Sequence, residues 1–82
     1  SRGLGDVYKR QDDTDVICLI DCNWSNKKAD SDVLKKLLAK GELFTGVDKR
    51  FLCFSKKGFT DECMKISAGD PHLRLISLKY MK

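Results

Sequence analysis

The feature that most constrains the fold of this chain is a run of five consecutive apolar residues at positions 16–20. An apolar run without alternating polar side chains is typical of a strand that is buried on both faces. Strands of this kind belong to parallel sheets, and parallel neighbours need a long crossover connection that usually contains a helix. We therefore expect helices and strands to alternate along the rest of the chain.

Two segments have the spacing of amphipathic helices. Residues 30–41 place apolar side chains on one stripe, with Asp30, Ser31 and Asp32 as N-cap candidates and Gly41 as the expected stop. Residues 60–68 begin with Thr60 as an N-cap candidate, followed by two acidic residues in the first turn. Both segments lie between apolar runs, as crossover helices do.

Strands are expected around these helices, over residues 16–24, 49–55 and 72–78. The order β-α-β-α-β predicts an α/β fold, with parallel strands joined by right-handed crossovers and helices covering the sheet. A chain of 82 residues has room for one such domain. The first strand is too apolar for a sheet edge, so we expect it to pair with strands upstream of Asp12.

Residues 1–11 differ from the rest because they show neither strand nor helix periodicity. They resemble a translated sequencing adapter, and the alternative is a natural, basic, disordered arm. Without them the formal charge falls from +4 to +2, which is weak support for a nucleic-acid surface. On the adapter interpretation, residues 12–82 are the truncated C-terminal part of a longer domain.

Polar residues follow the apolar run at the expected carboxyl end of the first strand. Asp21 and Asn23 are two positions apart, so their side chains share a face of the strand. The carboxyl ends of parallel strands are where α/β proteins place ligands. Trp24 follows and is expected to cover the core. Asp21 and Asn23 are therefore the candidate site residues.

Four segments carry a family resemblance: residues 20–24, 30–37, 54–62 and 73–76. Together they resemble the C-terminal domain of a group of archaeal and bacterial AAA-type P-loop ATPases, a domain of unknown function that is similar to restriction-endonuclease-like PD-(D/E)XK folds. The string Phe-Ser-Lys-Lys-Gly-Phe-Thr at 54–60 is its most specific part. The resemblance implies a mixed sheet flanked by helices, an upstream ATPase domain as partner that alone binds ATP, and DNA as a further partner.

The same resemblance implies a nuclease-like site. In nuclease-like members a strand carries an acid, a spacer and a lysine; the acid and an earlier Asp bind a divalent cation such as Mg²⁺. Here Asp21 takes the position of the acid, as a metal ligand, and Asn23 that of the lysine. Asn23 has no charge, and the earlier Asp is expected upstream, so the site is expected to be catalytically degenerate. The alternative is that Asp21 and Asn23 are only polar residues at a strand end.

Several lysines are candidates for the missing charge or for phosphate contact. Lys27, Lys28, Lys35 or Lys36 could replace the lysine that Asn23 displaces, although a lysine-rich helix face is usually only a solvated face. The loops after the first two strands lie on one edge of a parallel sheet, which makes their lysines candidates for nucleic-acid binding. These loop lysines are Lys27, Lys28, Lys56 and Lys57.

The sequence gives little support for a zinc site, a glycine-rich phosphate loop or a membrane-spanning segment. The four cysteines, Cys18, Cys22, Cys53 and Cys63, contain no C-x2-C pair, so reduced buried thiols are expected rather than zinc ligands. No glycine-rich phosphate loop is present. No apolar run approaches membrane-spanning length, so we expect a cytoplasmic protein without a membrane partner.

Three functional hypotheses follow. The first is an accessory domain of an AAA-type ATPase, nuclease-like in fold but degenerate, with a nucleic-acid-associated or regulatory role. The second is a Mg²⁺-dependent DNA nuclease that is active in the full-length chain. The third is a protein-interaction module that docks on its own ATPase domain through the strand at 16–20 and its neighbours.

Overall fold

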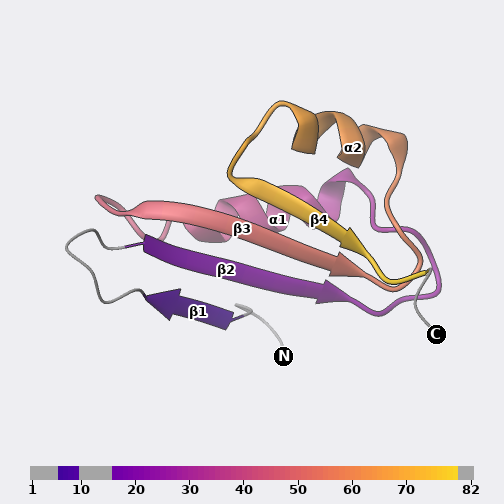
Figure 1. Cartoon of the computed structure of the whole chain (residues 1–82), viewed down its shortest axis with the longest axis horizontal. Coiled ribbons are helices and arrows are strands. Elements are labelled where there is room, and N and C mark those ends of the chain that lie inside the picture. Colours follow the sequence, from indigo (N-terminus) through magenta and orange to yellow (C-terminus); the bar gives the residue numbers. More distant parts are fainter. Residues whose placement is uncertain (1–5, 10–15, 80–82) are drawn as a thin grey trace.

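The structure is a computed structural model that describes residues 6–9 and 16–79 (Figure 1). Along the chain, the elements are β1 (Asp6–Lys9), β2 (Val16–Asn23), α1 (Ser31–Gly41), β3 (Asp48–Ser55), α2 (Asp61–Ala68) and β4 (Leu73–Ser77). The α/β fold and the β-α-β-α-β order expected from the apolar pattern are confirmed. The strand and helix bounds lie within one or two residues of the expected ones.

The sheet has the order β1-β2-β3-β4. Strands β2, β3 and β4 are parallel, with Leu19 beside Phe51 and Phe51 beside Leu73. The strands described within residues 16–79 are thus all parallel, and the mixed sheet expected for this part of the chain is not found among them. The antiparallel neighbour of β2 is β1. Strand β1 lies within residues 1–11, the segment that resembles a translated sequencing adapter. The origin of residues 1–11 stays a prediction.

Both helices pack on the same face of the sheet, so the sheet is not flanked on two sides by the described elements. Helix α1 contacts β2, β3 and α2, while α2 contacts β4 and α1 (Figure 1). The strands advance in one direction from β2 to β4, and right-handed crossovers then put both helices on one side. The core lies between these layers and is formed by Ile17, Leu19, Leu34, Leu37, Cys53, Cys63 and Leu73.

Helix α1 begins where the sequence predicts and ends differently. Asp30 is the N-cap, and its carboxylate accepts hydrogen bonds from the backbone N–H groups of Asp32 and Val33. Gly41 is not a left-handed stop, because it is still helical and Glu42 follows as the cap. Gly41 is needed for space instead: a Cβ there would lie 2.6 Å from the ring Cζ of Phe51.

The loops at the carboxyl edge of the parallel strands are joined by hydrogen bonds. The N–H of the fully buried Ala29 donates to the Gly58 carbonyl at 2.9 Å, and the Ala29 carbonyl accepts from the Thr60 N–H at 3.1 Å. The hydroxyl of buried Ser55 also donates to the Gly58 carbonyl, at 2.7 Å. The starts of α1 and α2 are therefore held together at the edge where the candidate site lies.

Candidate functional site

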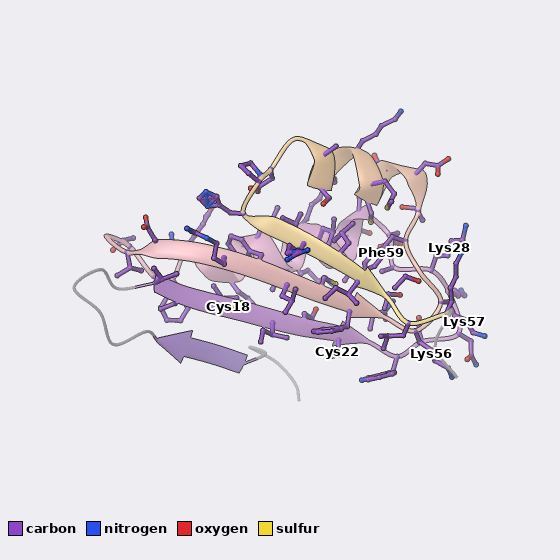
Figure 2. All side chains as sticks on the ribbon, viewed as in Figure 1. Cys18, Cys22, Lys28, Lys56, Lys57 and Phe59 are labelled. Atoms are coloured by element: carbon purple, nitrogen blue, oxygen red, sulfur yellow. The ribbon has the colours of Figure 1, made fainter. Side chains whose placement is uncertain are left out.

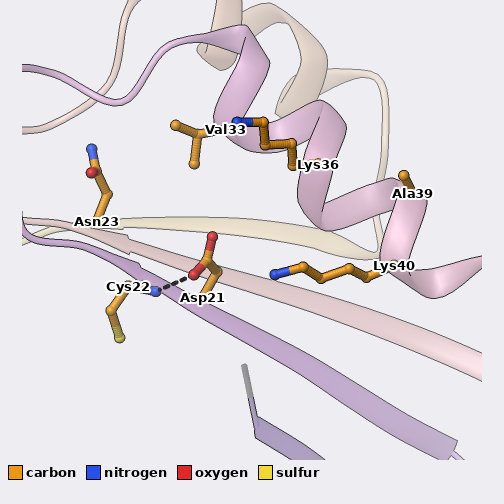
Figure 3. A pocket seen from close by; sticks show the side chains of 7 residues that line it. All are labelled: Asp21, Cys22, Asn23, Val33, Lys36, Ala39 and Lys40. Carbon is orange, nitrogen blue, oxygen red and sulfur yellow. Dashed lines mark hydrogen bonds between the residues drawn. The ribbon is translucent and has the colours of Figure 1, made fainter. Parts of the chain in front are cut away.

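Asp21 and Asn23 lie together at one end of β2 and share a groove between β2 and α1. The groove has a volume of about 360 Å³. It is lined by Asp21, Cys22, Asn23, Val33, Lys36, Ala39 and Lys40. Figure 3 shows Asp21 and Asn23 pointing from the strand towards α1. The expectation that the two side chains share a face is thus confirmed.

Two lysines of α1 line this groove. Lys36 and Lys40 are four residues apart, so they project from the same face of the helix. Figure 3 shows the Lys40 side chain extending towards the Asp21 carboxylate. Lys36 was one of the expected substitutes for the lysine that Asn23 displaces. Lys40 was not expected, although its spacing from Lys36 was the signal that could have revealed it.

The Asp21 carboxylate is half-buried and accepts a hydrogen bond from the Cys22 backbone N–H at 2.9 Å. Among the residues that the structure describes, it is the one carboxylate that lines the groove. Within residues 6–9 and 16–79, no group of three His, Cys, Asp or Glu side chains lies close enough to hold a metal ion. Magnesium requires six ligands in octahedral geometry, several of them waters but some from protein or substrate. Because one or two carboxylates can hold Mg²⁺ together with water and substrate phosphates, a Mg²⁺ site at Asp21 stays a prediction.

The lysines Lys27, Lys28, Lys56 and Lys57 lie outside the groove, on the adjoining edge of the sheet. All four are exposed, and Figure 2 shows Lys28, Lys56 and Lys57 near one another at that end. The Lys56 N–H donates to the Asn23 carbonyl at 2.9 Å, and the Lys56 Nζ donates to Asn26 Oδ1 at 3.2 Å. The expected common edge is confirmed, whereas a role in nucleic-acid binding stays a prediction.

Acidic side chains offset these lysines. The helices that start at the same edge carry exposed acids in their first turns or caps: Asp30, Asp32, Asp61 and Glu62. Lys79 follows β4 at the same edge, with its side chain beside Gly58, so five positive and four negative side chains of the described residues share this edge and their net charge is small. Among the described residues, the groove is lined by two lysines and one carboxylate.

Among the aromatic and thiol residues nearby, Trp24 and Cys53 do not line the groove. Trp24 is 62% exposed, so the expectation that it covers the core is wrong. Burial, and secondarily the Asp21 carboxylate, raises the pKa of Cys53 to about 12. The Cys53 thiol is thus neutral at pH 7 and is not a nucleophile. Its contribution to the free energy of unfolding is full below the ordinary pKa of 9.0 and is lost as the pH rises towards 12.

No family model matches the chain. No curated protein and no solved structure matches it either. The resemblance to the ATPase-linked, nuclease-like domain therefore stays a prediction. Within the described part of the chain, neither helix combines the length and the hydropathy that a membrane-spanning helix requires.

Proposed function

We propose that this chain is a nuclease-like domain that binds phosphate groups of DNA in the groove between β2 and α1 and does not cleave them. The observation that carries the proposal is the convergence of Lys36 and Lys40 with Asp21 and Asn23 in one groove. Two ammonium groups can bind phosphate oxygens, and Asn23 adds amide N–H donors for the same ligand. The position of Asp21 and Asn23 on a parallel strand before a helix supports the restriction-endonuclease-like fold that the resemblance implies.

The absence of cleavage follows from the chemistry of the groove. In the nuclease-like members that the chain resembles, the acid and an earlier Asp together hold the cation, and among the described residues Asp21 is the one acid that lines this groove. Without the cation, the groove lacks a means of generating hydroxide at neutral pH. Binding then requires only charge and hydrogen bonds, both of which the groove supplies.

The test is DNA binding measured at several salt concentrations. Fluorescently labelled duplex and single-stranded DNA are titrated with the wild-type chain and with the double variant Lys36→Ala/Lys40→Ala. Each lysine that contacts a phosphate contributes about 0.7 to 0.9 to the slope of log K against log salt. We expect the slope to fall by about 1.5 in the double variant, together with the affinity at low salt.

The matched control is Lys35→Ala/Lys65→Ala. It removes the same charge from exposed positions on α1 and α2 that do not line the groove. We expect this control to keep the wild-type salt slope. Equal slopes in the wild-type chain and the Lys36/Lys40 variant, or equal losses in the variant and the control, would refute phosphate binding in the groove.

The nuclease alternative is tested on the same samples. With Mg²⁺ or Mn²⁺ added, we expect no cleavage by this chain. Metal-dependent cleavage that Asp21→Asn abolishes would replace the binding proposal with an active nuclease whose second carboxylate lies outside the described residues. The association with an upstream ATPase domain rests on the sequence resemblance, and the gene sequence upstream of residue 12 tests it by showing whether a Walker A loop is present.

A further inference from the structure

Among residues 16–79, Trp24 is the exposed member of the Phe and Trp side chains. It is 62% exposed, whereas the phenylalanines are half-buried, and the core is formed without it. Tryptophan is highly buried on average, because its ring carries a large apolar surface. Single exposed apolar residues are nevertheless common on proteins, so the place of Trp24 in the fold decides what its ring can do.

Trp24 lies next to the proposed phosphate groove. It directly follows Asn23, which is the last residue of β2 and lines the groove. Consecutive Cα atoms are about 3.8 Å apart, so a strand with one phosphate in the groove can bring an adjacent base to the indole. The end of β2 is anchored here, because the Asn23 carbonyl accepts a hydrogen bond from the Lys56 N–H at 2.9 Å.

The loop that follows Trp24 is held by side-chain hydrogen bonds. The Ser25 hydroxyl donates to the Lys27 carbonyl at 3.2 Å and accepts from the Lys27 N–H at 3.3 Å. The Lys56 Nζ donates to Asn26 Oδ1 at 3.2 Å. These bonds restrict the backbone on the far side of Trp24, and a restricted loop loses less conformational entropy when a ligand binds.

The size of the groove and the exposed ring both favour a single strand over a duplex. The groove has a volume of about 360 Å³, which is near the lower end of the range for pockets that hold small molecules. It therefore admits a phosphate and its sugar, but not a duplex. In a duplex the faces of the bases are covered by their neighbours, whereas the unstacked bases of a single strand stack on aromatic side chains.

We infer that the groove binds single-stranded DNA, with one base stacked on the indole of Trp24 and a neighbouring phosphate held by Lys36 and Lys40. The inference rests on the proposed function and names the form of DNA that the same site takes. Stacking of this kind tolerates any sequence, because every base has a π-face. Trp24 thus adds affinity for single strands without adding base specificity.

The fluorescence of Trp24 provides the test. Trp24 is the single tryptophan of the chain, so a change in tryptophan fluorescence reports on this position alone. The probes are an oligothymidylate, an abasic strand of the same length and a duplex of the same length. We expect the oligothymidylate to quench the fluorescence and to bind more tightly than the other two. The abasic strand keeps the phosphates and lacks the bases, so it should bind without quenching.

Two substitutions of Trp24 separate stacking from a change in charge. Trp24→Ala should weaken binding of a labelled oligothymidylate by about fivefold or more, as expected for the loss of one base–aromatic stack. Trp24→Phe keeps a ring and should recover part of this loss. The matched control is Leu43→Ala, which removes another exposed apolar side chain, in the connection after α1, and should bind like the wild type.

The possible failures of the inference and of the proposed function differ. The inference is overturned, and the phosphate groove stands, if binding requires Lys36 and Lys40 but is equal for the oligothymidylate and the abasic strand. Wild-type affinity of Trp24→Ala for the oligothymidylate, or tighter binding of the duplex, overturns it in the same way. If Lys36→Ala/Lys40→Ala keeps the affinity and the salt slope of the wild type, the proposed function is refuted and the inference with it.

Discussion

Gly41 shows how a single residue can fix the packing of a helix on a sheet. It is the last residue of α1 and is buried. A Cβ placed on Gly41 would lie 2.6 Å from Cζ and 2.8 Å from Cε1 of the Phe51 ring on β3. The side chain is therefore absent for steric reasons, since Gly41 has no positive φ. The close approach of α1 to β3 depends on this absence.

We predict that Gly41→Ala destabilises the protein, although alanine is the better helix former by about 1 kcal/mol. The Cβ would force the Phe51 ring or the helix to move, and overpacking of this kind costs about 1–3 kcal/mol. Urea unfolding followed by circular dichroism measures the change. In a Phe51→Leu background the same substitution should cost less, because the conflicting ring atoms are gone.

Gly69→Ala is the matched control for this prediction. Gly69 follows α2, and the nearest atoms to its Cβ position are backbone oxygens at 3.8 Å, an ordinary contact distance. We expect its free energy of unfolding to stay within about 0.5 kcal/mol of the wild type. A stabilising Gly41→Ala would show that the ring of Phe51 can move aside at no cost.

Helix α1 is the element on which both the core and the groove depend. Its inner side contributes Leu34 and Leu37 to the core, and another part of its surface carries Lys36 and Lys40 into the groove. Its start is fixed by Asp30, which accepts hydrogen bonds from two backbone N–H groups, at 3.1 and 3.3 Å. A change at this cap should therefore affect the whole helix.

We expect Asp30→Ala to lower the free energy of unfolding by about 1 kcal/mol, since it removes the acceptor for both N–H groups. Asp30→Asn should cost only a few tenths of that amount, because asparagine caps equally well and the same charge is lost. Thermal and urea unfolding of the two variants measure the difference. Equal destabilisation by both would show that the charge of Asp30, rather than its hydrogen bonds, stabilises α1.

The sequence predicted those elements whose signals are local. The apolar run of β2, the stripe of α1 and the caps Asp30 and Thr60 each follow from a few neighbouring residues. The groove was predicted in part: the alternation along β2 placed Asp21 and Asn23 together, whereas Lys40 was missed, and its spacing from Lys36 shows only that the two share a face of the helix. Whether a lysine faces solvent or β2 depends on how α1 is rotated over the sheet, and that rotation is set by distant contacts such as Gly41 with Phe51.

The molecule as a whole has a sheet whose two edges differ. Strand β4 is one edge, and on the other side β2 is shielded by β1, which pairs with it in antiparallel orientation from Asp6 beside Ile20 to Lys9 beside Ile17. Unpaired edges of apolar strands template association between molecules. The short strand β1 therefore has a protective role in this chain, whatever its origin.

We predict that deletion of residues 1–11 leads to self-association. The deletion leaves unpaired those backbone groups of β2 that face away from β3 between Ile17 and Ile20, on a strand that is apolar on both faces. Sedimentation velocity at increasing protein concentration measures the change in mass. Val7→Pro, which removes one backbone donor from β1 and keeps the chain length, should give a weaker shift in the same direction. If the deleted chain stays monomeric at all concentrations, protection by β1 is excluded.

The bonds around Ala29 also determine where the chain can accept foreign sequence. Its N–H and carbonyl tie the loop before α1 to the loop before α2, and the Cys63 thiol donates to the same carbonyl at 3.3 Å. An insertion there would break these hydrogen bonds and shift the starts of α1 and α2 relative to each other. At the opposite end of the sheet, Gly46 has a φ of +79° and no atom within 4 Å of its Cβ position. An epitope tag, a fluorophore attachment site or new termini from circular permutation are therefore best placed next to Gly46.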